Sequence, residues 1–149
     1  MTLVEALVAV VLVSLGFTSL CLGMSGGFAV TKHCRENLRA TQIMLERLEG
    51  IRLYNWNQLC YSNMIPMDFT TYYYPFATNA ESKGVVYQGK MQVATPTLNP
   101  AASYVGNMRA VTVTLTWTNK NGGSSQIVRT RTMTTYSSRN GVQNYVFNN

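Results

Sequence analysis

The sequence has little charge and very few of the side chains that carry out catalysis. Only 12% of its 149 residues are charged, about half of the usual share of roughly 25%. The sequence has only six side-chain carboxylates, one histidine and three cysteines. Such a composition leaves little material for acid–base chemistry, and we expect that the protein is not an enzyme. The 46% of hydrophobic residues suffices for a core and argues against a disordered chain.

The sequence also lacks the ligand patterns of metal and cofactor sites. His33 stands alone beside Cys34, and three scattered cysteines with one histidine do not have the spacing of a zinc site. Asp68 and Glu81 are the only carboxylates after residue 55, too few for a calcium site. No phosphate-binding loop or nucleophile elbow occurs. We therefore expect no metal and no cofactor.

The charges that are present are unevenly distributed along the chain. Glu5 is the only charged side chain in residues 1–31, whereas residues 32–54 carry five basic and three acidic groups. Residues 55–149 carry seven basic groups and two acidic ones, and the whole chain has a net charge of +6. This distribution predicts an apolar arm, residues 1–31, followed by a basic head, residues 32–149.

The arm is long enough to cross a membrane as a helix. Residues 6–31 are 26 residues without a charge, which as a helix extend about 39 Å, more than the ~30 Å of a hydrocarbon core. A secretory signal peptide fits less well, because no Lys or Arg precedes the apolar run. Glu5 would cost a few kcal/mol at mid-bilayer, so either it has a partner or a function, or it lies at the interface and favours the helix N-terminus.

Glycines are frequent in the second half of the arm. They are Gly16, Gly23, Gly26 and Gly27. Gly23 and Gly27 have the four-residue spacing of small residues that let helices approach closely. The Gly26–Gly27 pair is also a position at which the helix is expected to bend or loosen.

The first residues of the arm resemble those of a known family. The run Thr2-Leu3-Val4-Glu5-Ala6-Leu7-Val8-Ala9 is similar to the mature N-terminus of type IV pilins and pseudopilins, which have Glu at the fifth position before an apolar helix. The resemblance implies that a prepilin peptidase has removed a leader, so that Met1 is the first mature residue with an N-methylated amine. It covers only the arm, and Leu22 stands near the place where many members have proline.

The same resemblance implies two successive locations for the protein. The subunit would first be held in the inner membrane by its single helix. The pilus assembly machinery would then transfer it into an extracellular helical filament of identical subunits. Met1 and Glu5 would be the assembly residues, and Gly16, Gly23, Gly26 and Gly27 would serve helix packing or flexibility.

The head begins with the pattern of an amphipathic helix, residues 32–54. Its apolar positions recur at three- and four-residue steps and predict one stripe that packs on a sheet. The stripe consists of Leu38, Thr41, Leu45 and Leu48, with Met44 and Ile51. Residues 55–84 have no clear period and are predicted to be a long connecting loop region, with room for a short helix or strand. Its Tyr72–Tyr74 run is expected to take part in packing between subunits.

The rest of the head, residues 85–136, is predicted to be an antiparallel sheet. Residues 85–95 alternate weakly, and residues 110–118 alternate cleanly between apolar side chains and threonines. Residues 119–123, Asn-Lys-Asn-Gly-Gly, predict the turn of a hairpin with residues 126–136. Residues 137–149 form a polar tail whose Tyr145, Val146 and Phe147 are expected to fold back. The predicted fold class is α+β, with a long N-terminal helix whose apolar half projects and whose other half packs on the sheet in a pilin-like layout.

Cys34 and Cys60 are the available pair for a disulfide in an oxidising extracellular setting. If the helix continues to Tyr54, Cys34 lies ~30 Å back along it. Six further residues can return at most ~20 Å of that distance. A disulfide within one chain is therefore excluded, and either a disulfide between subunits or free thiols remain.

These observations support several hypotheses on function. The first is a structural subunit of an extracellular type IV pilin-like filament, self-assembling through its apolar helix in adhesion, motility or surface interaction. A second keeps the fold but makes the chain a minor pilin or a pseudopilin of a type II-like secretion system. A third is a DNA-uptake pilin, since the basic head can attract DNA or charged surfaces. A fourth is a single-span anchored binding protein, for which Glu5 would be dispensable.

Overall fold

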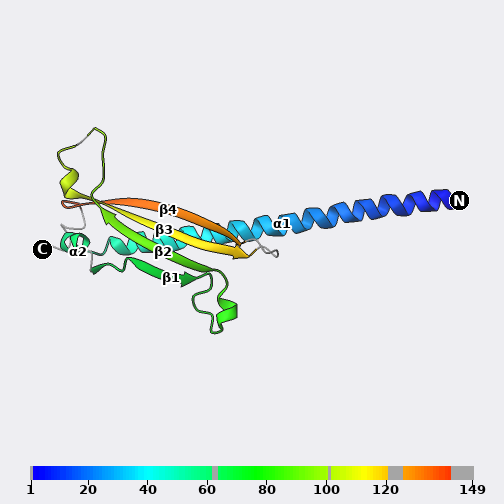
Figure 1. The fold of residues 1–149 in the computed structure, drawn as a ribbon, viewed down its shortest axis with the longest axis horizontal. Helices are drawn as coiled ribbons and strands as arrows, with labels where there is room; N and C mark the ends of the chain where they lie inside the picture. The colour runs from blue at the N-terminus through cyan, green and yellow to red at the C-terminus, as the bar shows by residue number, and fades with distance from the viewer. Residues whose placement is uncertain (1, 62–63, 101, 121–125, 142–149) are drawn as a thin grey trace. The chain divides into compact units, whose positions relative to one another are not determined.

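The computed structural model describes residues 2–61, 64–100, 102–120 and 126–141. It has two compact units, residues 1–38 and 39–149, with the division falling inside the first helix. That helix, α1, extends over Leu3–Ile51, and a second helix, α2, over Trp56–Cys60. The strands are β1 (Asp68–Tyr72), β2 (Val86–Ala94), β3 (Met108–Lys120) and β4 (Gln126–Ser138). Two short 3₁₀ turns, η2 (Ala80–Lys83) and η3 (Val105–Asn107), lie between strands (Figure 1). The predicted α+β class, with a long N-terminal helix and an antiparallel sheet, is confirmed.

α1 is a continuous helix of 49 residues, including Gly26 and Gly27, where a bend or loosening was expected. It ends at Ile51 because its last turn tightens. The amide nitrogens of Arg52, Leu53 and Tyr54 each bond to the carbonyl oxygen three residues back, at 3.1 Å. The chain then starts the short helix α2.

Asn55 closes the N-terminus of α2 with a reciprocal pair of hydrogen bonds. The backbone N–H of Gln58 donates to Asn55 Oδ1 at 2.9 Å, and the backbone N–H of Asn55 donates to Gln58 Oε1 at 3.0 Å. This capping box satisfies two amides that would otherwise lack partners. Two helices therefore follow one another with only a short turn between them.

The four strands form one antiparallel sheet in the order β1-β2-β3-β4. Neighbours along the chain pair directly, as Figure 1 shows, so the sheet is a simple meander. β3 pairs with β4 from Met108↔Ser138 to Lys120↔Gln126, which confirms the predicted hairpin. Its turn falls partly on residues 121–125, and most of the predicted tail on residues 142–149, both outside the described residues.

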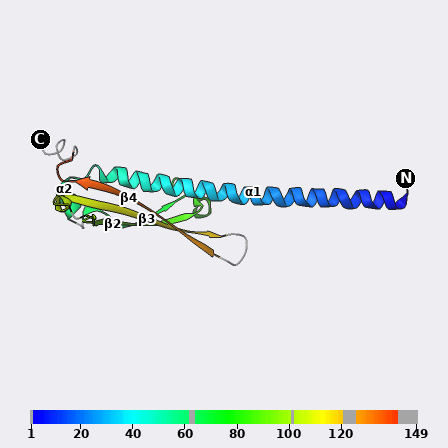
Figure 2. The same ribbon diagram turned by 90° about the horizontal axis from the view of Figure 1, so that it is seen from above.

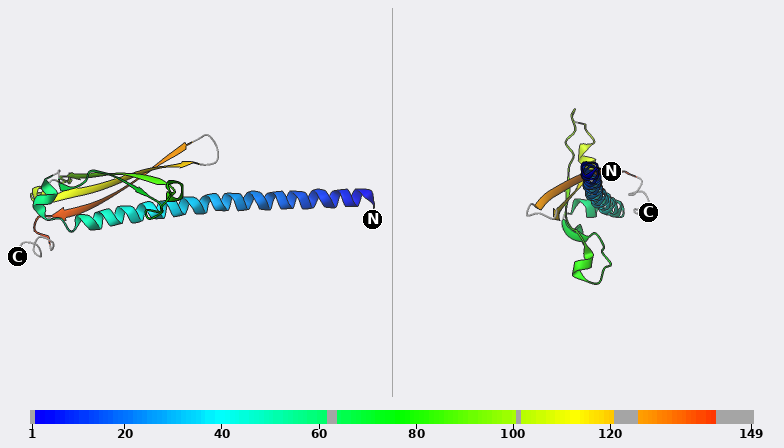
Figure 3. Two further views of the ribbon diagram at one scale, coloured as in Figure 1. Left: turned by 90° about the horizontal axis from the view of Figure 1, so that it is seen from below. Right: turned by 90° about the vertical axis from the view of Figure 1, so that its right-hand side faces the viewer.

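The sheet is covered on one face by the C-terminal part of α1 (Figures 2 and 3). Trp117 is 2% exposed, and Val111, Val113 and Leu115 are fully buried on the same face, as the alternation predicts. The tilted rings of Tyr87 and Trp117, with centroids 5.5 Å apart, extend the core onto β2. Threonines occupy the other face, where Thr112 and Thr134 place their hydroxyl oxygens 3.0 Å apart.

The stripe that the helix presents to the sheet matches the predicted one only in part. Met44, Leu48 and Ile51 are buried as predicted, together with Ala40 and Ile43. By contrast, Leu45 is 47% exposed and Leu38 is 65% exposed, so their assignment to the packed stripe was wrong. Both stripes satisfy the period of a helix. Contacts with the sheet, rather than the period, decide which one is buried.

The connecting region 55–84 contains more structure than a loop. α2 buries Leu59, and β1 adds a fourth strand that pairs with β2 from Asp68↔Lys90 to Tyr72↔Val86. β1 is short and its side chains do not alternate between polar and apolar residues. The period on which strand prediction depends is therefore missing there.

Gly89 on β2 allows an aromatic ring to lie against the backbone of the sheet. Its cross-strand partner is Phe69 on β1, and a Cβ atom at position 89 would overlap the Phe69 ring. On the same ring, the guanidinium carbon of Arg47 lies 4.4 Å from the centroid. An aromatic side chain that covers a cross-strand glycine helps to fix the register of a strand pair. Phe69 thus connects β1, β2 and the head part of α1.

We predict that Gly89→Ala destabilises the head by about 1–3 kcal/mol, because the added methyl group forces the Phe69 ring out of its site. The measurement is thermal unfolding of the full-length protein in detergent micelles, followed by circular dichroism. Gly50→Ala is the matched control, since a Cβ there meets nothing within 4 Å and alanine favours a helix. In Phe69→Ala, the further change Gly89→Ala is expected to cost almost nothing, and an undiminished cost would contradict the overlap.

Candidate assembly surface

The N-terminal part of α1 is an apolar helix whose side chains are uncovered on all sides. Every residue from 2 to 32 is exposed, with large apolar side chains such as Leu3 at 82% and Phe28 at 70%. α1 is long and apolar enough to cross a membrane by length and composition. A helix that is apolar all round is stable only where lipid or protein covers it. We call residues 3–31 the apolar arm.

The hydroxyl groups of the apolar arm are satisfied by its own backbone. Each serine or threonine hydroxyl donates to a carbonyl oxygen three or four residues earlier, at 2.7–2.9 Å. The donors are Ser14, Thr18, Ser19, Ser25 and Thr31. In a medium without water, each polar group needs a partner inside the protein. The arm meets this requirement without a neighbouring helix, so its hydroxyls do not oppose burial in lipid or among other arms.

The glycines of the arm leave open space on its surface. A Cβ atom at Gly16, Gly23, Gly26 or Gly27 would meet nothing within 4 Å. These glycines are therefore not required by packing inside the described chain. Because glycine has no side chain, a second helix can approach the backbone closely at these positions.

Glu5 lies in the first turn of α1, where a negative charge is favourable at the helix N-terminus. Its backbone N–H donates to the carbonyl oxygen of Thr2 at 3.0 Å and has a longer contact to Thr2 Oγ1 at 3.4 Å. Thr2-x-x-Glu5 therefore has the spacing of a capping box. The T-x-x-E pattern in the sequence indicates this helix start, although the capping box was not among the sequence-based predictions. Among the described residues, none forms an ion pair with the Glu5 carboxylate, and Met1 lies outside them.

The three cysteines are free, exposed thiols. Cys21 belongs to the apolar arm, Cys34 lies just beyond it on α1, and Cys60 ends α2. Cys34 and Cys60 are thus accessible to a second molecule, and both alternatives, free thiols and a disulfide between subunits, stay open.

Several basic groups of the head lie over aromatic rings. The charged groups of Lys83 and Arg109 lie 4.8 and 5.0 Å from the ring centroids of Tyr72 and Trp56. Arg47 lies over Phe69 in the same manner. Each of these cations is thus held in place by a cation–π contact with one aromatic ring. Among the described residues, no group of three or more His, Cys, Asp or Glu side chains is placed to hold a metal ion.

Comparison with known protein families, with curated proteins and with solved structures gives no match to this chain. Any assignment of function therefore depends on the physical properties of the chain itself.

We predict that thiol labelling separates Cys21 from the other two cysteines in native membranes. A hydrophilic maleimide should label single-cysteine variants that retain Cys34 or Cys60, because both lie outside the apolar arm. The variant that retains Cys21 should react only after transfer to a denaturant, because hydrocarbon excludes the charged reagent. Rapid labelling of Cys21 in sealed membranes would contradict a membrane position of the arm.

Proposed function

We propose that this chain is a structural subunit of an extracellular filament of the type IV pilin kind, held in the inner membrane before assembly. The observation that carries the proposal is the apolar arm: residues 3–31 are exposed all round, contain one charged side chain and satisfy their own hydroxyls. Such a helix suits two apolar surroundings, a bilayer and a bundle of copies of itself.

Association of arms in a membrane cannot be driven by removing apolar surface from water, because lipid already covers it. Close packing and polar partners must supply the free energy instead. The open faces at Gly16, Gly23, Gly26 and Gly27 permit the close packing. Glu5 supplies the polar partner.

Glu5 gives the assembly its register. A carboxylate buried among apolar arms without a partner costs several kcal/mol, so it requires a cation or a proton. Residues 2–31 contain no Lys, Arg or His. The N-terminal amine is the remaining cation at this depth, and the amine of an adjacent subunit meets Glu5 only at one axial stagger. Charge pairing therefore selects a single arrangement of neighbours.

We predict that Glu5→Gln and Glu5→Ala both reduce filament yield by about tenfold or more, because either change removes the charge that pairs with the amine. The measurement is electron microscopy and quantification of sheared filaments from cells that express only the variant. Both variants should remain in the membrane fraction with a folded head.

The pair of variants also separates the charge of Glu5 from its place in a capping box, since Gln can replace Glu in that motif. Normal filaments from Glu5→Gln with loss in Glu5→Ala would reduce Glu5 to a helix cap. Normal filaments from both would contradict the pairing, whereas the absence of filaments from the unchanged chain would favour a single-span anchored binding protein, for which Glu5 is dispensable. Glu49→Gln is the control, because it removes one carboxylate from an exposed pair with Arg52 at 3.2 Å and should leave the yield unchanged.

A further inference from the structure

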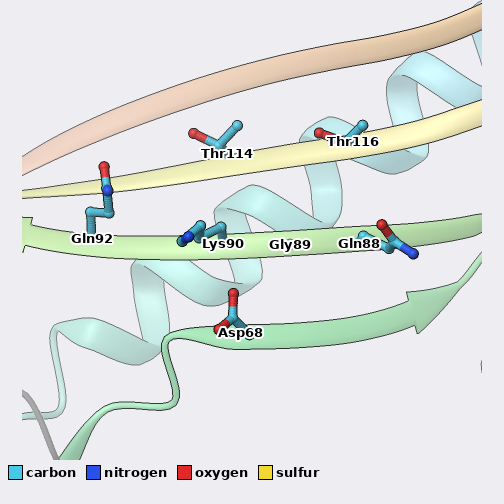
Figure 4. A pocket seen from close by; sticks show the side chains of 7 residues that line it. All are labelled: Asp68, Gln88, Gly89, Lys90, Gln92, Thr114 and Thr116. Atoms are coloured by element: carbon cyan, nitrogen blue, oxygen red, sulfur yellow. The ribbon is translucent and has the colours of Figure 1, made fainter.

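The face of the sheet that turns away from α1 carries a polar groove of about 390 Å³. It is lined by Asp68 of β1, by Gln88, Lys90 and Gln92 of β2 together with the Gly89 backbone, and by Thr114 and Thr116 of β3. Figure 4 shows these side chains on the near side of the strands, with the helix behind them. The volume lies within the range of about 300–1,000 Å³ that is usual for small-molecule sites.

The alternation of β2 places the groove residues on one face. Tyr87, Gly89 and Met91 are buried, whereas Gln88, Lys90 and Gln92 between them are exposed. Gln88 and Gln92 lie about 13 Å apart along the strand. The groove is thus an elongated track on a rigid sheet, bounded by hydroxyl groups on one side and by Asp68 on the other.

Most hydrogen-bonding groups of the groove have no partner among the described residues, the exception being the Thr114 hydroxyl, which lies 3.3 Å from the Thr132 hydroxyl. Asp68 and Lys90 are register partners, yet they do not form an ion pair with each other. The side chains of Gln88 and Gln92 likewise make no hydrogen bond to the described part of the chain. An amide, a carboxylate and an ammonium group therefore all present free bonding capacity to whatever enters the groove.

The charge of the groove indicates the class of ligand. Asp68 and Lys90 sum to zero, so the site attracts neither a polyanion such as DNA nor a polycation. Two amides and two hydroxyls can each both donate and accept, while Asp68 accepts and Lys90 donates. A ligand that matches this set must offer donors and acceptors in close succession without net charge. The adjacent hydroxyl groups of a neutral sugar chain do so.

We propose that this groove binds a neutral, polyhydroxylated ligand, namely an uncharged oligosaccharide chain laid along β2. The inference does not depend on the proposed filament function, because the groove belongs to the head alone. No aromatic ring lines the groove, so binding relies on hydrogen bonds and is expected to be weak for a single site.

The test uses the full-length, ¹⁵N-labelled protein in dodecylphosphocholine micelles, whose headgroup contains no sugar and cannot compete. Maltoheptaose, cellohexaose and chitohexaose are the neutral probes, and a hyaluronan octasaccharide is the acidic one. We expect at least one neutral probe to shift the side-chain amide signals of Gln88 and Gln92 saturably. The acidic probe should leave these signals in place.

Variants locate the binding. Gln88→Ala and Gln92→Ala should each weaken the binding of the neutral probe by about fivefold to tenfold, as loss of a hydrogen-bonding amide implies. Gln126→Ala is the matched control on the same face, at the far end of the hairpin, and should bind normally. Asp68→Asn leaves Lys90 uncompensated and should admit the acidic probe.

Two results would overturn the proposal. One is that no neutral probe shifts the groove signals. The other is that the groove variants bind as well as Gln126→Ala does. Neither of these results bears on Glu5, so the failure of this inference is distinguishable from failure of the proposed function.

Discussion

An apolar helix that cannot remain in water is the constraint on which the rest of this protein depends. Residues 3–31 are exposed on every side, and apolar surface in water costs about 25 cal/mol per Å². The cost summed over so many exposed side chains far exceeds the 5–15 kcal/mol by which a domain is usually stable. The arm must therefore always lie in lipid or against protein, and its few polar groups have to be compatible with both.

The arm and the head part of α1 belong to one continuous helix but have different surfaces. In the arm, hydroxyls bond to the preceding turn, so the surface is uniform and admits neighbours from any direction. In the head, Ala40, Met44 and Leu48 lie four residues apart and face the sheet. The exposed Leu45 lies on another side of the helix.

The sequence predicted the elements with strong periodicity and failed where tertiary contacts decide. β3 and β4 alternate cleanly, and Trp117 is buried as its place in that pattern requires. β1 lacks such alternation, because its partnership with β2 depends on Phe69 covering Gly89, a contact between residues far apart in the sequence. The buried stripe of α1 was predicted only in part for a related reason. Leu38 and Leu45 fit the helical period together with the buried residues Met44, Leu48 and Ile51, and only the sheet decides which side chains are covered. For the candidate assembly surface, the length of the apolar arm and the solitary charge of Glu5 could be predicted from the sequence. The hydrogen bonds from the arm's hydroxyls to the preceding turn could be seen only in the structure.

The edge strand β4 carries features that oppose association through the sheet. β4 is an edge strand of 13 residues, long enough to template pairing with another chain. Its inward positions carry Arg129 and Arg131, and Arg131 donates to Thr41 on α1 at 3.4 Å. Charged side chains that point inward at an edge oppose edge-to-edge pairing, because stacking a further strand would bury them. Hydroxyl pairs such as Thr112–Thr134 keep the opposite face polar without adding charge. Association is thereby disfavoured at the sheet edge, and in the proposed filament it is left to the apolar arm, where a single carboxylate would set the register.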